Sequence, residues 1–103
     1  MVTFANEQTP LFELGRVVST PGAIQALENA GVDGRELLAR HERGDWGNVG
    51  VEDRQTNNEA LKDGSRLLSS YALPNGVKIW IVTEAVGDDG KRASTSFLTP
   101  DEY

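Results

Sequence analysis

The residue best suited to acid–base chemistry is His41, the only histidine of the chain. Its ordinary pKa lies near neutrality, so it could act as a general acid or base. It opens the stretch HERGDWG, which holds Asp45 and Trp46 between two glycines. The same stretch is typical of a helix C-terminus, where an imidazolium complements the helix dipole and Gly44 stops the helix. Trp46 would then plug the core, and Asp45 would cap a turn. We favour this structural interpretation.

A second polar cluster, formed by Lys91, Arg92, Ser94 and Thr95, lies near the end of the chain. Strand alternation places Arg92 and Ser94 on one face and Thr95 on the other. An ordinary edge strand explains these residue types, because a basic start and β-branched hydroxyl residues suit such strands.

Joined to His41, the second cluster indicates a chemical alternative. Helices with a histidine, followed by an antiparallel sheet with Arg92 and Ser94 or Thr95, loosely resemble metal-independent endoribonucleases of the barnase, EndoU, colicin and RelE type. In that chemistry the histidine transfers a proton and a cation stabilises charge on the phosphoryl group. The hypothesis fails if His41 and Arg92 lie on opposite sides of the molecule.

Polar residues of the segment 51–62 form a third cluster. Acidic residues of this kind usually make a solvated helix face. The functional alternative is a recognition surface for a protein partner. The candidate binding residues are Asp45, Trp46, Glu52, Asp53, Arg54, Asn57 and Asn58.

Metal and cofactor sites have no support in the sequence. The chain has no cysteine and one histidine, which excludes thiolate sites and a multi-histidine zinc site within one chain. The acidic residues lack EF-hand spacing, and the glycines at 44, 47 and 50 do not match a phosphate-binding loop. We therefore predict neither a metal nor a cofactor.

The first half of the chain must supply helices. Thr20 as N-cap, Pro21 at the first position and Gly31 as the stop predict one helix. Asp33 and Glu36 have capping-box spacing at the start of a second helix. A third helix is predicted over residues 51–62.

The second half of the chain has the alternation of strands. Strands are predicted over residues 66–73, 77–85 and 92–98, joined by short turns, with a last helical turn after Thr99. The fold class is therefore α+β, with two or three helices on one face of a three-stranded antiparallel meander. A fourth, edge strand from residues 12–19 is an alternative. Residues 1–10 are predicted to be a flexible lead-in to a single domain over residues 11–103.

The net charge narrows the class of partner. The chain has 103 residues and a formal net charge of −6, the opposite sign from a generic nucleic-acid binder. An acidic surface suits a basic partner or mimicry of a phosphate backbone. The N-terminus does not resemble a signal peptide, and the longest apolar runs are too short to span a membrane. We expect a cytoplasmic protein.

Several stretches resemble a family of small uncharacterised proteins encoded on plasmids and other mobile elements. The stretches are TPLFELGRVVSTPGAIQALENAG, LLARHERGDWG, NNEALKDGSRLLSSY, KIWIVTEA and STSFLTPDEY, in that order over residues 9–103. Members are called plasmid-related, and some carry a type I restriction label, although this chain has no methyltransferase motif. The junction TEAVGDDGKRAST is longer here than the family's, which changes the spacing between Glu84 and Arg92.

The leading functional hypothesis is a non-enzymatic accessory protein of a mobile element that binds another protein. A sharper version is an anti-defence inhibitor that presents its acidic surface to a basic site. The alternatives are the small endoribonuclease, using His41 and Arg92, and a structural domain that forms a homodimer through an exposed edge strand.

Overall fold

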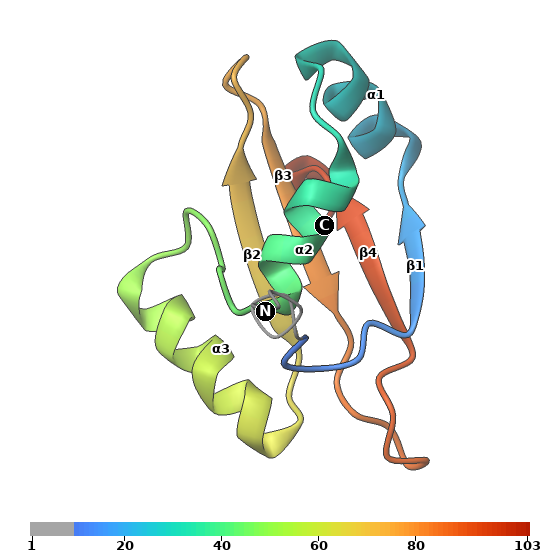
Figure 1. Ribbon diagram of the computed structural model, residues 1–103, viewed down its shortest axis with the longest axis vertical. Coiled ribbons are helices and arrows are strands. Elements are labelled where there is room, and N and C mark those ends of the chain that lie inside the picture. Colours follow the sequence, from blue (N-terminus) through green and yellow to red (C-terminus); the bar gives the residue numbers. More distant parts are fainter. Residues whose placement is uncertain (1–9) are drawn as a thin grey trace, which may run out of the picture.

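The computed structural model describes residues 10–103, which form three α-helices and a four-stranded mixed sheet (Figure 1). The predicted lead-in of residues 1–10 therefore falls almost entirely outside the described residues. The elements, in chain order, are β1 (Arg16–Ser19), α1 (Pro21–Ala30), α2 (Gly34–Glu42), α3 (Val51–Asp63), β2 (Leu67–Ala72), β3 (Lys78–Thr83), β4 (Ser94–Leu98) and the 3-10 turn η2 (Pro100–Glu102).

Local signals set the helix ends. The Thr20 side chain accepts a hydrogen bond from the Ala23 N–H at the start of α1, and Gly31 ends that helix at φ 68°. Asp33 caps α2 through the Arg35 N–H, rather than through a capping box with Glu36. The capping box that does form joins Thr99 and Glu102 in the last turn of the chain.

The sheet has the order β1-β4-β3-β2. Strands β2, β3 and β4 form the predicted antiparallel meander, with Ser69 opposite Ile81 and Ile81 opposite Phe97. The prediction of a purely antiparallel sheet is wrong, because β1 pairs with β4 in parallel. Since α1 and α2 follow β1, the chain travels across one face before it returns, which permits the parallel pairing.

The core lies between the sheet and the two helices α1 and α2 (Figure 1). Ile79 and Ile81 of the central strand β3 are fully buried on this face. They pack with Leu27 of α1, Leu37 of α2 and Phe97 of β4. The opposite face is also partly covered, because Tyr103 packs edge-on against Trp80 with ring centroids 5.4 Å apart. Strand β3 is therefore an inner strand that is at least partly covered on both faces.

Helix α3 lies beside the edge strand β2 instead of over the sheet (Figure 1). Only Asn57 and Ala60 of this polar helix are buried. Ala60 joins a small second cluster with Trp46 and Leu67. The predicted surface helix is thus present, and it packs on the rest of the fold through these few inward-facing residues.

Candidate functional site

A buried polar network surrounds His41 and connects four elements. His41 of α2 is 0% exposed. Its Nδ1 atom lies 2.5 Å from the Ser69 hydroxyl of β2, and its Nε2 atom lies 2.8 Å from the Thr83 hydroxyl of β3. The Thr83 hydroxyl lies 2.7 Å from that of Thr95 on β4, which donates to the carbonyl oxygen of Leu14 at 2.8 Å. Every side chain in this network has a partner.

The Leu14 carbonyl at the end of this network determines which group donates in each hydrogen bond. The Leu14 carbonyl can only accept, so Thr95 uses its single hydroxyl proton there. Thr83 must then donate to Thr95 and accept from His41 Nε2. The network therefore fixes a proton on Nε2, and in a neutral imidazole Nδ1 accepts from the Ser69 hydroxyl.

Burial opposes a charged imidazole at this position. Desolvation, with a smaller contribution from the nearby Arg92 charge, lowers the pKa of His41 from 6.5 to about 3. The prediction that an imidazolium complements the dipole of α2 is therefore wrong, because the ring is neutral at pH 7. Its place in the last turn of the helix is as predicted.

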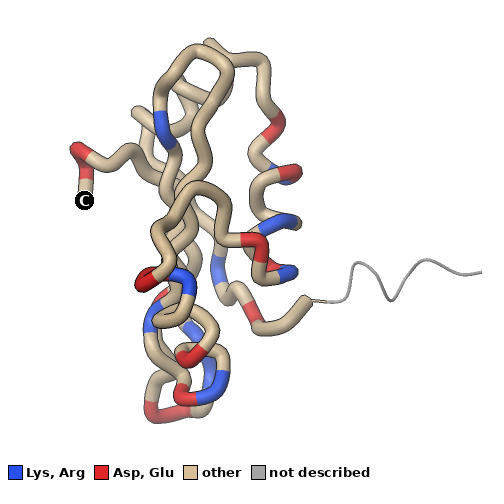
Figure 2. Tube along the Cα trace, turned by 90° about the vertical axis from the view of Figure 1, so that its left-hand side faces the viewer, with Lys and Arg blue, Asp and Glu red and all other residues tan. Residues whose placement is uncertain are grey.

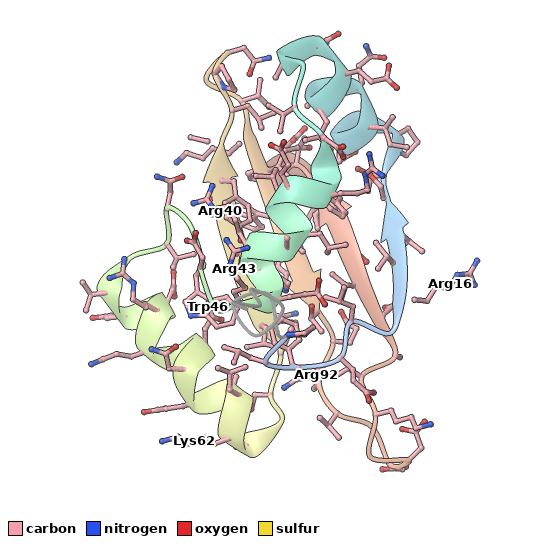
Figure 3. The ribbon with its side chains drawn as sticks, viewed as in Figure 1. Arg16, Arg40, Arg43, Trp46, Lys62 and Arg92 are labelled. Carbon is pink, nitrogen blue, oxygen red and sulfur yellow. The ribbon has the colours of Figure 1, made fainter. Side chains whose placement is uncertain are left out.

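Arg92 fastens three segments through their backbone carbonyls. Its guanidinium donates to the carbonyl oxygens of Ser65 at 2.7 Å, Glu84 at 3.0 Å and Ala60 at 3.1 Å. Ala60 lies in the last turn of α3, Ser65 in the link between α3 and β2, and Glu84 directly after β3. Arg92 is 7% exposed, and burial lowers its pKa. Figure 3 shows it near the lower end of α2.

Residues 10–15 cover this polar region. The Phe12 ring meets the His41 ring edge-on at 5.1 Å and stacks on Trp46 at 6.2 Å. It also lies 5.8 Å from the Arg92 guanidinium carbon. The Leu11 N–H donates to the Glu42 carbonyl oxygen at 2.8 Å, which fastens the segment to the end of α2.

The structure brings together three of the four candidate catalytic residues. His41, Arg92 and Thr95 gather around Phe12 and the network, whereas alternation along β4 places Ser94 on the opposite face of the sheet. The prediction that Arg92 and Ser94 share a face is wrong, because β4 begins at Ser94 and Arg92 lies outside the strand. The grouping does not present a reactive site. Both ring nitrogens of His41 are used internally, and the Arg92 guanidinium is held by carbonyl oxygens.

The candidate binding residues have mixed positions. Trp46 is 3% exposed, and its indole N–H donates to Asn58 at 3.1 Å, so it plugs the core as the structural interpretation predicted. Asp45 caps the turn at Gly47 and pairs with Arg40 at 2.8 Å, which lowers the pKa of Asp45. The remaining candidates, Glu52, Asp53 and Arg54, are exposed on α3, whereas Asn57 is buried.

The outer edge of β2 is closed by hydrogen bonds from the preceding segment. The side-chain amide of Asn57 donates to the Leu68 carbonyl at 2.7 Å and accepts from the Leu68 N–H at 3.1 Å. The Ser70 N–H donates to the Trp46 carbonyl, and its carbonyl accepts from the Asn48 N–H. The Ala72 N–H donates to the Asn48 side chain. Another strand cannot pair here without displacing these groups.

Among residues 10–103, the outer edge of β1 is open. Register with β4 directs the backbone groups of Arg16 and Val18 inward, and the Arg16 N–H donates to Ala93 at 3.0 Å. The groups of Val17 and Ser19 therefore point away from the sheet, and no described residue pairs with them. Val17 is 43% exposed, and Figure 3 shows Arg16 directed away from the sheet.

An apolar groove of about 390 Å³ lies beside this open edge, between β1 and the helices α1 and α2. Its apolar lining comes from Val17, Ile24, Leu27, Val32, Leu38 and Phe97. Ile24 is 46% exposed at the groove. Glu28, Asp33 and Arg35 complete the rim, and Arg35 pairs with Asp33 at 2.8 Å. We call this surface, including Ser19, the β1 groove.

The hydrogen-bond partners of His41 and the β1 groove were not predicted from the sequence. Ser69, Thr83 and Thr95 occupy inward positions of their strands, in phase with buried neighbours such as Tyr71, Ile81 and Phe97. The alternation therefore places three hydroxyl groups at buried positions, where each needs a hydrogen-bond partner. The single histidine is a candidate partner, so the sequence does hold a signal for this network. The β1 groove leaves no comparable signal, because it depends on the parallel pairing of the chain's two ends.

No family model, curated protein or solved structure matches this chain. Among residues 10–103, no helix combines the length and apolar character needed to cross a membrane. The same residues contain no cluster of three or more histidine, aspartate or glutamate side chains that could hold a metal ion.

Proposed function

We propose that this chain is a protein-interaction domain that binds a partner segment at the open edge of β1. The observation that carries the proposal is the contrast between the two sheet edges. The β2 edge is occupied by Asn57, Asn48 and Trp46, whereas no residue of the described part of the chain pairs with the outward backbone groups of β1, which lie beside an apolar groove. Addition of a strand at such an edge is a common mode of peptide recognition.

The open edge is a better candidate than the α3 surface. The exposed residues of α3 are charged and polar, and Asn57 and Asn58 already serve the fold. The β1 groove instead combines exposed aliphatic side chains with unpaired backbone donors and acceptors, the two requirements of strand addition. An accessory role in a mobile element, including inhibition of a defence protein, is consistent with this kind of binding.

The charge pattern favours a local recognition site over a uniform acidic mimic. The net charge is −6, yet acidic and basic positions are interspersed along the trace (Figure 2). Mimicry of a phosphate backbone would need acidic side chains gathered on one face. We therefore place recognition at the β1 groove, and the net charge then biases the choice of partner.

An edge-blocking variant tests this proposal. Val17→Pro removes an outward N–H but leaves the inward donors of Arg16 and Val18 for the ladder with β4. A pull-down from a lysate of the source organism should recover a stoichiometric partner with the wild-type chain and lose it with Val17→Pro. Asp53→Lys, on the exposed face of α3, should retain the partner. Loss with Asp53→Lys alone would move the site to α3 and contradict the proposal.

A further inference from the structure

We propose that the segment bound at β1 is extended and carries an aliphatic side chain with a lysine or arginine two residues away. This inference rests on the proposed function, since it assumes that a strand adds at β1. It assigns the chemistry of the partner from the β1 groove itself.

The spacing follows from strand geometry. Val17 and Ser19 both line the groove, so this side of β1 faces α1 and α2. Side chains of an added strand alternate in the same way, and only every second one faces the groove. The groove volume of about 390 Å³ falls within the range of small-ligand pockets. It is thus large enough for one aliphatic side chain and the methylene stem of another.

The charges at the rim favour a cation for the second position. Arg35 is bound to Asp33 through its Nε and Nη2 atoms, so this pair is internally neutralised. Glu28 on α1 therefore supplies the negative charge of the groove that no salt bridge within residues 10–103 neutralises. A lysine or arginine can lay its apolar stem on the groove and bring its charge to Glu28.

The same charges disfavour a second copy of this chain as the occupant. Each copy has a formal net charge of −6, so two copies repel one another as they approach. A twin would also present Val17 and Ser19 to the groove, and neither of these side chains is a cation for Glu28. A cationic segment from another protein is attracted by the net charge and by the rim.

The test uses a displayed library of short extended peptides in which the two groove-facing positions are randomised. Selection against the wild-type chain should return an aliphatic residue at one position and lysine or arginine at the other. Selection against Glu28→Lys should return aspartate or glutamate instead. The cationic peptides should bind Glu28→Lys about three- to tenfold more weakly, as expected for reversal of an exposed ion pair.

Matched variants separate this inference from the proposed function. Gln25→Lys places a lysine on α1 at an exposed residue outside the groove, although it adds one positive charge where Glu28→Lys also removes a negative one, and it should leave affinity nearly unchanged. Ile24→Lys places a cation in the groove at an exposed position and should abolish binding, which provides a second variant if Val17→Pro does not fold.

Each outcome supports or overturns one of the two proposals. Peptides that need the open edge but ignore Glu28→Lys would overturn the cationic assignment and leave the interaction domain intact. Failure to select any peptide sensitive to Val17→Pro or Ile24→Lys would overturn both. Self-association that Val17→Pro abolishes would replace the cationic segment with a second copy of the chain.

Discussion

His41 shows how one side chain can look catalytic in sequence and be structural in the fold. Its two nitrogens are satisfied by Ser69 and Thr83, and the chain of hydroxyls ends at the Leu14 carbonyl. The residue therefore joins α2 to β2, β3 and β4 and, through Thr95, to the covering segment. A buried network that is fully satisfied favours a single arrangement of these elements.

The first prediction concerns the pH dependence of stability. The pKa of His41 is about 3 in the folded chain and 6.5 when unperturbed, so the unfolded chain binds more protons between these values. The free energy of unfolding should therefore fall as the pH falls below about 6.5, by up to about 1.4 kcal/mol per pH unit. Urea unfolding between pH 7.5 and 5 measures this slope.

His41→Gln is the control for that prediction, because a neutral amide keeps hydrogen-bonding capacity but does not titrate. The variant should be less stable at pH 7.5 and should show a much flatter dependence down to pH 5. An equal slope in both proteins would mean that His41 titrates normally, and it would contradict the neutral network.

The second prediction concerns Arg92. Arg92→Lys keeps the charge, but an ammonium cannot span the carbonyls of Ala60, Ser65 and Glu84 with the planar geometry of a guanidinium. We expect a loss of about 2 to 4 kcal/mol in the free energy of unfolding. The exposed Arg16→Lys should change it by less than about 0.5 kcal/mol. Equal effects in chemical denaturation would show that Arg92 does not fasten these segments.

At the scale of elements, the two edges of the sheet differ because of one short stretch. Asn48 lies in the turn after α2, and Asn57 lies on α3, so the segment that leads into β2 also seals its edge. Gly47 permits the close approach, because it has a φ of 75° and an added Cβ would collide with the Ser70 carbonyl. Among residues 10–103, no equivalent segment lies beside β1.

The third prediction tests the closed edge. Asn57→Ala removes both hydrogen bonds to the Leu68 backbone and leaves a sheet edge open beneath α3. We expect a loss of about 1 to 3 kcal/mol in the free energy of unfolding and concentration-dependent self-association by light scattering. Asn58→Ala, which removes the bond to Trp46 at an exposed residue, should cost less and leave the protein monomeric. Association of Asn58→Ala alone would contradict this explanation.

The elements could be predicted from the sequence where their signals are local. Thr20, Pro21 and Gly31 define α1 within a few residues, and the turns around Gly76 and Gly90 define the meander. The candidate site was predicted less well. His41, Arg92 and Thr95 do lie together, but their burial could not be predicted from local sequence patterns. Residues 10–15, which are distant in the sequence, cover them.

At the scale of the whole molecule, the fold is closed by its two ends. Arg16 of β1 is paired with Ser94 of β4, and the Thr20 hydroxyl donates to Glu102 at 2.7 Å. Contacts between such distant residues form at a high cost in chain entropy. This pairing is also what local sequence patterns could not predict. The strand with the open edge is thus also the one that pairs with a strand distant in the sequence.

The fourth prediction follows from that closure and is tested by native-state hydrogen exchange. The Ile81 amide lies in the central strand and is fully buried, so it should exchange only through global unfolding, with a free energy equal to that from urea. The Val18 amide faces β4 from an exposed edge strand, so it should exchange through local opening with a smaller free energy and little denaturant dependence.

A partner strand at β1 should raise the protection of Val17 and Val18 against exchange, whereas the exchange of Ile81 should still follow global stability. Equal exchange free energies for Val18 and Ile81 in the free protein would show that β1 opens only when the whole domain unfolds. That result would contradict the prediction.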